Sequence, residues 1–315
     1  MSALHALSAA ELGAAYRQRT LSPVEVTQAV IEHIAAWEPA LCATYLFRPE
    51  HALEQARASE ARWARGAPQS ALDGVPLTLK DNIATAGDPM PLGTAAVGEA
   101  PMPADAPAAA RLREAGAVLV TKTTMPDYGM LSSGLSSIHA TARNPWDLSR
   151  TPGGSSAGAG SAAAAGYGPL HLGTDIGGSI RLPASWCGIF GLKPSLGRVP
   201  IDPPYTGRAA GPMTRTVHDA ALMMQVLSLP DVRDTMSLPY QAIEWHRLDA
   251  GVERPRGLRI GLLMDAGCGL PVDPEVRSAV EAAAQQLAAA GAIVEPMKPF
   301  LTREMLDGMD HFWRL

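Results

Sequence analysis

Two serines lie in glycine-rich turns in the middle of the chain. Ser155 is in the segment GGSS, which runs from Gly153 to Ser156, and Ser179 is in the segment GGSIR. Glycine permits backbone conformations that are closed to other residues and lets other atoms approach the main chain, so these turns can present a hydroxyl beside free amide groups. Each serine is therefore a candidate nucleophile, although glycine turns also serve as plain tight connections.

A serine hydroxyl is a weak nucleophile at neutral pH and needs a base within hydrogen-bond reach. The eight histidines are scattered, without a GxSxG elbow or metal-ligand spacing, which disfavours a His-based triad or a zinc site. The other available base is a lysine whose pKa is lowered by burial, and Lys80 ends the apolar segment VPLTLK. On its local pattern alone, Lys80 is also typical of an ordinary lysine at a strand end in water.

The apolar runs and turn signals around these residues predict an α/β protein. The predicted strands cover residues 75–79, 117–121, 170–173, 258–264 and 292–297. The predicted helices cover residues 106–115, 156–165, 217–229 and 273–290. Because strands alternate with helices, we expect parallel crossovers. Residues 231–255 are predicted to form a long loop on the surface, a surface excursion. The one candidate boundary between two parts of the chain lies near residues 230–257.

Two S-x-x-E capping boxes predict helix starts near the N-terminus. Ser8 pairs with Glu11, and Ser22 pairs with Glu25 and is followed by Pro23, which is favoured at the first helical position. We therefore expect a single domain over 1–315. It would consist of an N-terminal helical layer at 1–70, a catalytic core at 71–230 and a further βαβ unit at 257–315.

The composition fits a protein with a substantial core, since 47% of the 315 residues are hydrophobic and 18% are charged. The formal charge of −5 makes nucleic acid and anionic membranes poor default partners and favours small neutral or cationic ligands. Three widely separated cysteines and the lack of a signal-like or spanning apolar segment predict a cytoplasmic protein. The sequence leaves open whether the protein forms a homodimer, and neither a cofactor nor a metal is expected.

Three motifs in this chain resemble those of the amidase signature family. They are a K-D-N segment at Lys80-Asp81-Asn82, the GGSS turn, and a G-T-D-x-G-G-S-x-R-x-P block at Gly173 to Pro183. They occur in the family's order, and CGIFGLKPSLGRVP and GPMTRTVHDAALM extend the resemblance over nearly the whole chain. The resemblance implies the amidase-signature fold, a mixed, largely parallel central β-sheet covered by helices on both faces.

The resemblance also implies a division of roles among three residues. Ser179 is similar to the acylated nucleophile, and Ser155 is similar to the bridging serine that the family holds after a cis peptide bond. Lys80 is similar to the neutral lysine that starts the proton relay. A desolvated lysine would then remove a proton from Ser179 through Ser155 and return it to the leaving group.

The same resemblance assigns the residues around the second turn. The backbone amides of Ile176, Gly177, Gly178 and Ser179 resemble the family's oxyanion hole. Asp175 and Arg181 flank this turn and are expected to hold its shape, and Ser156 is expected to support the first turn. For contact with the substrate, the candidates are Met125, Asp127, Tyr128 and Met130, whose alternative role is core packing.

Two departures from the family pattern stand out. The family's turn usually continues GGSSGG, whereas Ala157 replaces a glycine here, which matters only if that position needs a positive φ. A late segment of the LPVGLQLVG type is absent, so the chain is expected to be C-terminally truncated relative to the family.

The leading hypothesis is an amidase that hydrolyses a small carboxamide to a carboxylate and ammonia or an amine through acyl-Ser179. One alternative is the glutaminase subunit of a tRNA-dependent amidotransferase, which shares the triad and requires partner subunits. The other alternative is a catalytically inactive, truncated fragment.

Overall fold

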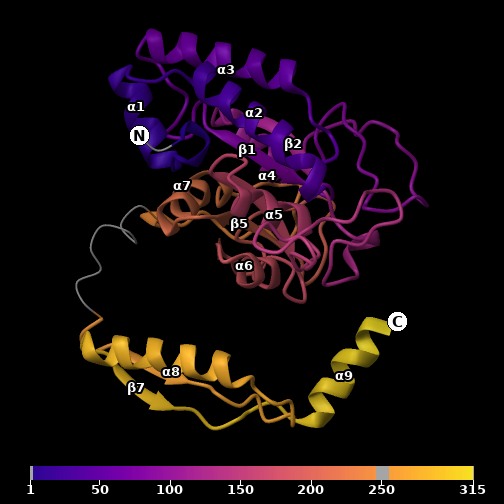
Figure 1. Ribbon diagram of the computed structural model, residues 1–315, viewed down its shortest axis with the longest axis vertical. Helices are drawn as coiled ribbons and strands as arrows, with labels where there is room; N and C mark the ends of the chain where they lie inside the picture. The colour runs from indigo at the N-terminus through magenta and orange to yellow at the C-terminus, as the bar shows by residue number, and fades with distance from the viewer. Residues whose placement is uncertain (1–2, 246–254, 315) are drawn as a thin grey trace. The chain divides into compact units, whose positions relative to one another are not determined.

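The computed structural model describes residues 3–245 and 255–314 of the chain. The chain divides into two compact units, Met1–Asp249 and Ala250–Leu315, and each is described by itself. The first unit contains the central sheet and helices α1 to α7, and the second contains α8 and α9 (Figure 1). Residues 246–254, within the predicted surface excursion, lie outside the described residues.

The first unit is built on a five-stranded sheet with the order β2-β1-β3-β5-β4. The strands are β1 (Pro76–Lys80), β2 (Val118–Thr123), β3 (Leu170–Asp175), β4 (Phe190–Gly191) and β5 (Ala209–Thr214). β1 is parallel to both β2 and β3, whereas β5 is antiparallel to β3 and β4. The predicted mixed, largely parallel sheet is confirmed.

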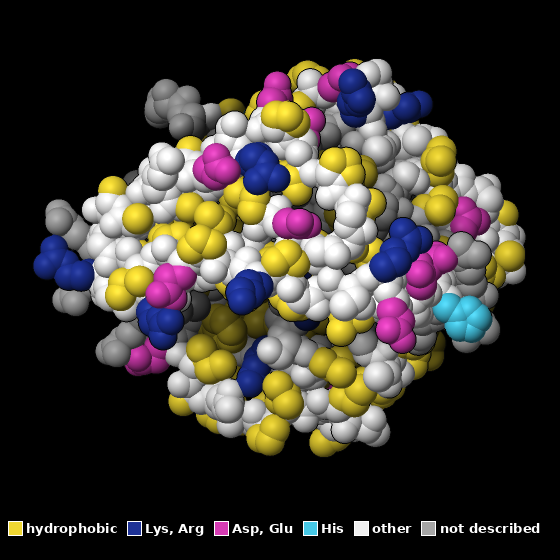
Figure 2. Space-filling model, turned by 90° about the horizontal axis from the view of Figure 1, so that it is seen from below, with side chains coloured by type: hydrophobic (Ala, Val, Ile, Leu, Met, Phe, Trp, Pro, Cys, Tyr) yellow, Lys and Arg dark blue, Asp and Glu magenta, His cyan; other side chains and the backbone are white. Residues whose placement is uncertain are grey.

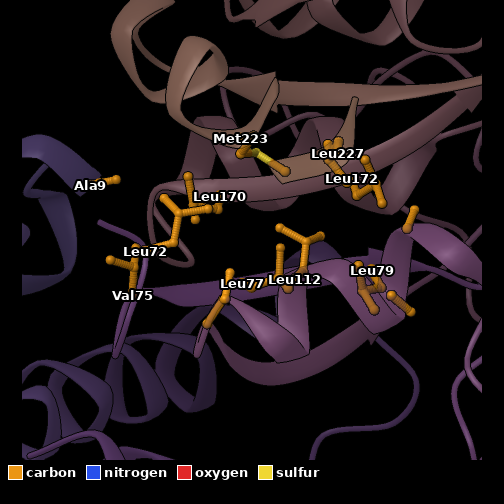
Figure 3. Close-up of a cluster of buried hydrophobic side chains, with 14 of the residues drawn as sticks. Ala9, Leu72, Val75, Leu77, Leu79, Leu112, Leu170, Leu172, Met223 and Leu227 are labelled. Atoms are coloured by element: carbon orange, nitrogen blue, oxygen red, sulfur yellow. The ribbon is translucent and has the colours of Figure 1, made fainter. Parts of the chain in front are cut away.

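Helices cover both faces of this sheet. The helices are α1 (Ala9–Gln18), α2 (Pro23–Leu41), α3 (Pro49–Ala64), α4 (Pro107–Glu114), α5 (Ala157–Ala165), α6 (Arg181–Cys187) and α7 (Val217–Leu227). Leu77 and Leu172 pack with residues of α1, α4 and α7 in one apolar cluster (Figure 3). Val118 and Val120 pack with α2, α3 and α5 in a second cluster, while Leu119 between them contacts the first. Because alternate residues of a strand point to opposite faces, the two clusters lie on opposite sides of the sheet.

Both predicted capping boxes are present. The Ser8 side chain accepts a hydrogen bond from the Glu11 amide, Ser22 does the same for Glu25, and each glutamate reaches back to the cap residue. These bonds satisfy amide groups that the first helical turn leaves unpaired. α1 and α2 therefore begin where the local sequence predicts.

The second unit contains a parallel pair of strands joined by a helix. β6 (Arg259–Leu262) pairs with β7 (Ile293–Pro296), and α8 (Pro274–Ala289) connects them. The predicted βαβ elements are thus present, although both strands are shorter than expected. Another helix, α9 (Arg303–Arg314), follows.

The molecular surface carries charges of both signs. On the face drawn in Figure 2, Lys and Arg side chains are interspersed with Asp, Glu and hydrophobic side chains. Across the part of the chain that the structure describes, helices with the length and apolar character needed to cross a membrane are absent.

Candidate active site

Strand β1 delivers Lys80 to the carboxyl-terminal edge of the sheet. The side chain is completely buried. Its Nζ lies 2.8 Å from Ser155 Oγ and 2.9 Å from Thr174 Oγ1, and it donates to both hydroxyl oxygens. The amine therefore lies between the first glycine turn and the end of the neighbouring strand β3.

The surroundings of Lys80 favour its neutral form. Burial lowers the pKa of the amine from its ordinary 10.5 to about 7, since a buried charge loses its hydration. The Asp81 carboxylate raises this pKa and the Arg208 guanidinium lowers it further, both to a smaller degree than burial. A large share of Lys80 is thus neutral at physiological pH and able to accept a proton.

Ser155 lies just before Ser156, the N-cap residue of α5, and follows a cis Gly154–Ser155 peptide bond. This cis bond is the one that the family resemblance implies. Gly154 packs tightly, since a Cβ there would lie 2.5 Å from the Ser133 backbone nitrogen. Gly129 also borders the Ser155 hydroxyl, because its own Cβ would lie 3.1 Å from Ser155 Oγ.

A backbone hydrogen bond joins the two glycine turns. The Ser156 amide donates to the Ser179 carbonyl oxygen at 3.1 Å. The Ser156 hydroxyl accepts from the Thr174 amide and donates to the Thr174 carbonyl, so it links the first turn to β3. Within the described residues, the half-buried Ser179 hydroxyl makes no hydrogen bond, which leaves it available to a substrate.

Asp175 organises the turn that carries Ser179. Its Oδ1 accepts from the Gly178 amide at 2.9 Å, and its Oδ2 accepts from the Ile180 amide at 3.0 Å. The Arg181 guanidinium donates to both carboxylate oxygens, at 2.8 and 3.0 Å. Such bonds to a carboxylate are strong and directional, so this pair fixes the backbone of the turn.

This arrangement changes the number of amides in the turn that are open to a ligand. The Gly178 amide is already bonded to Asp175, so it is not free to bind a substrate oxygen. No hydrogen bond among the described residues occupies the amides of Ile176, Gly177 and Ser179. Three of the four predicted donors therefore remain open.

Thr174 lies at the centre of the site, although none of the sequence motifs assigns it a role. Its hydroxyl accepts from Lys80 and, at 3.0 Å, from the Asn82 side-chain amide. The sequence signal that could have identified Thr174 is its position near the end of a strand parallel to β1, because the carboxyl ends of parallel strands meet at one edge of a sheet.

The aspartate of the K-D-N segment holds a neighbouring loop. Asp81 accepts from the amides of Leu92 and Gly93 at 3.0 and 2.8 Å. His139 Nε2 lies 3.3 Å from the same carboxylate. The side chain that contacts Ser155 is thus Lys80, while this histidine contacts Asp81.

The predicted substrate-contacting residues divide into two groups. Met125 is buried, and Asp127 accepts hydrogen bonds from the amide and hydroxyl of Ser137, so both stabilise the loop. Tyr128 and Met130 are more than half exposed. These two are the most exposed members of the set, while Asp127 is partly exposed.

Ala157 raises no backbone conflict. It is the first residue of α5 and is buried, and its φ is not among the positive values of the chain. Alanine is well suited to a helix, so replacing the family's glycine is harmless here. The next residue does require glycine, since a Cβ on Gly158 would lie 2.1 Å from the Ala43 carbonyl oxygen.

A family model described as Amidase matches residues 25–312. The chain belongs to the amidase signature family. Curated relatives include proteins named as subunits of glutamyl-tRNA(Gln) amidotransferases. The one from Symbiobacterium thermophilum is 39% identical over 296 residues, which are 92% of this chain and 60% of the relative. The one from Chloroflexus aggregans is 40% identical over 293 residues, again with 60% of the relative covered.

Solved structures of family members share the fold. A bacterial aryl acylamidase has a TM-score of 0.89 at 33% identity, covering 99% of this chain and 65% of its own. The peptide amidase from Stenotrophomonas maltophilia has a TM-score of 0.85 at 34% identity, covering 92% and 62%. A 6-aminohexanoate cyclic dimer hydrolase has a TM-score of 0.85 at 32% identity, covering 94% and 61%. The chain thus spans about 60% of the length of the relatives it matches, and it belongs to a family of enzymes that act on C–N bonds.

Proposed function

We propose that this protein is an amidase that hydrolyses a small carboxamide through an acyl-Ser179 intermediate. The observation that carries the proposal is the 2.8 Å hydrogen bond between the buried Lys80 amine and Ser155 Oγ. A fully buried amine with a pKa of about 7 is suited to accept a proton from a neighbouring hydroxyl. Ser155, in turn, belongs to a turn that is hydrogen-bonded to the Ser179 backbone.

In the proposed reaction, Lys80 takes the Ser155 hydroxyl proton while Ser155 takes the proton of Ser179. The Ser179 oxygen then attacks the amide carbonyl carbon, and the carbonyl oxygen becomes negatively charged. The open amides of Ile176, Gly177 and Ser179 donate to this oxygen. Donors fixed before the reaction stabilise the developing charge, and losing one typically costs about 3 kcal/mol in the transition state.

The relay then runs in reverse. The proton held by Lys80 returns through Ser155 to the amide nitrogen, which departs as ammonia or an amine and leaves the acyl group on Ser179. A water molecule loses a proton to the same relay and attacks the ester, which releases the carboxylate and restores Ser179. Each residue therefore serves as both acceptor and donor.

Labelling with a fluorophosphonate tests the assignment of the nucleophile. We expect the reagent to modify the protein at Ser179, and Ser179→Ala to abolish the modification. Ser132→Ala, which removes an exposed serine from a loop, is the matched control and should label normally. Undiminished labelling of Ser179→Ala would reject Ser179 as the nucleophile, and absence of both labelling and turnover would favour a catalytically silent chain.

A second candidate function is the glutaminase component of a tRNA-dependent amidotransferase. The names of the curated relatives favour it, at 39 and 40% identity. Under this proposal glutamine is the substrate, and partner subunits receive the ammonia. Co-purification with partner subunits and glutamine hydrolysis that depends strictly on them would support it, whereas robust hydrolysis of simple amides by the isolated chain would contradict it.

A further inference from the structure

Arg208 lies beside the proposed oxyanion turn. β5 begins at the next residue, and its first residues Ala209 and Ala210 pair with Asp175 and Thr174 of the antiparallel strand β3. Continuing this register by one residue sets Arg208 opposite Ile176, the first residue of the turn. The loop that precedes β5 lies close to Ile176, since a Cβ added to Gly207 would lie 3.8 Å from Ile176 Cγ2.

The Arg208 guanidinium has few partners within the protein. Its Nη2 donates to the Pro203 carbonyl at 3.0 Å, and the group lies 5.5 Å from the centre of the Tyr205 ring. Its Nε is buried without a hydrogen-bond acceptor. In the described ranges 3–245 and 255–314, no carboxylate forms an ion pair with Arg208.

Other partly buried arginines of this chain are better satisfied. Arg62 forms an ion pair with Asp73 at 2.6 Å, and Arg111, whose Nε is also buried without an acceptor, pairs with Glu114 at 2.7 Å. Arg215 donates to three carbonyl groups. Burying a cation without a counter-charge is costly, so an arginine left in this state has capacity for an anion that the described residues do not supply.

Arg208 lines a small cleft together with Thr174, one of the two side chains that bond to Lys80. This cleft is lined by Asn82 and Thr174, whose side chains bond to each other, and Thr174 accepts from the Lys80 amine. Asp202 also lines it, as an exposed side chain that makes no ion pair with Arg208. Arg208 is close enough to Lys80 for its charge to lower the pKa of that amine.

We propose that Arg208 forms an anion subsite that binds a carboxylate on the amide substrate. A guanidinium presents parallel N–H donors that match the two oxygens of a carboxylate, which favours amides bearing such a group over neutral or cationic ones. The inference rests on the proposed amidase function and names its substrate class as small anionic amides. It departs from the expectation of neutral or cationic ligands that follows from the net charge of −5.

A matched set of amides tests the subsite. Succinamate carries a carboxylate, butyramide is neutral, and 4-aminobutanamide is cationic. We expect the ratio of kcat/KM for succinamate to kcat/KM for butyramide to fall about tenfold or more in Arg208→Met, because a charge-assisted bidentate contact is lost. Arg208→Lys keeps the charge but not the paired N–H donors of the guanidinium, so its ratio should fall less. Arg57→Met, at an exposed position on α3, is the control and should leave the ratio unchanged.

A binding measurement separates this subsite from the proposed hydrolysis. Calorimetric titration of succinamate and butyramide into Ser179→Ala, with and without Arg208→Met, needs no turnover. Tighter binding of succinamate that disappears with Arg208→Met supports the subsite even if no amide is hydrolysed. Equal affinity for the two amides, or an equal loss for both in folded Arg208→Met and Arg208→Lys proteins, would overturn it and leave Arg208 as a support of its loop.

Discussion

Replacing Lys80 with methionine should make the fold more stable at neutral pH while it removes activity. The pKa of Lys80 is about 7 in the folded chain and 10.5 when the side chain is exposed. The unfolded state therefore binds more protons than the folded state between these values, so stability rises with pH across this window. At pH 7 and below, the wild-type chain carries a penalty of about 4 kcal/mol that Lys80→Met does not.

The variant also loses two hydrogen bonds, those from Nζ to Ser155 and Thr174. At about 1 kcal/mol each, this loss leaves Lys80→Met about 2 kcal/mol more stable than the wild type at pH 7. The penalty shrinks as pH rises, so the difference in the free energy of unfolding should cross zero near about pH 9 and reverse above it.

Urea denaturation of both proteins between pH 6 and pH 10 measures this difference. Taking the difference cancels the titration of groups that the two proteins share. Lys298→Met, at an exposed position, is the control whose difference from the wild type should stay flat. If the difference in the free energy of unfolding between wild type and Lys80→Met is also independent of pH, the reasoning is refuted. Such a result would mean that burial does not shift the pKa of the Lys80 amine.

Three further substitutions follow from the geometry. Ser155→Ala breaks the proposed relay and should lower kcat by about 100-fold or more, with little change in KM, in steady-state assays. Asp175→Ala frees the Gly178 amide and the rest of the turn, so it should cost about 2 kcal/mol of stability by urea denaturation as well as activity. Gly158→Ala should destabilise the fold by about 1 to 3 kcal/mol, whereas Gly98→Ala, with nothing within 4 Å of the added Cβ, should be nearly neutral in thermal melts.

Features set by short stretches of sequence were predictable. The capping boxes at Ser8 and Ser22 fix helix starts because their partners are three residues away. The sheet and its covering helices followed from the alternation of strands and helices and from the family resemblance. Lys80 and Ser155, far apart in sequence, were brought into one hypothesis by that resemblance, and the structure has them in contact.

Features that depend on packing between distant segments were not predictable. The bond between Asp175 and the Gly178 amide removes a donor that the motif alone counts as open. Thr174 contacts Lys80 only because β1 and β3 are neighbours in register. Among the described residues Arg208 forms no ion pair with a carboxylate, and this is likewise a property of the folded loop, since Asp202 lines the same cleft.

The central claim is that neutral Lys80 draws the proton from Ser179 through Ser155, and the pH dependence of Ser179 labelling tests it most directly. The rate of fluorophosphonate adduct formation at Ser179, located by peptide mass spectrometry, should rise with pH around a midpoint near 7 in the wild type. In Lys80→Met it should be about 100-fold slower or more and lose that midpoint. Equal labelling rates in the two proteins, or an adduct on a different residue, would contradict the account.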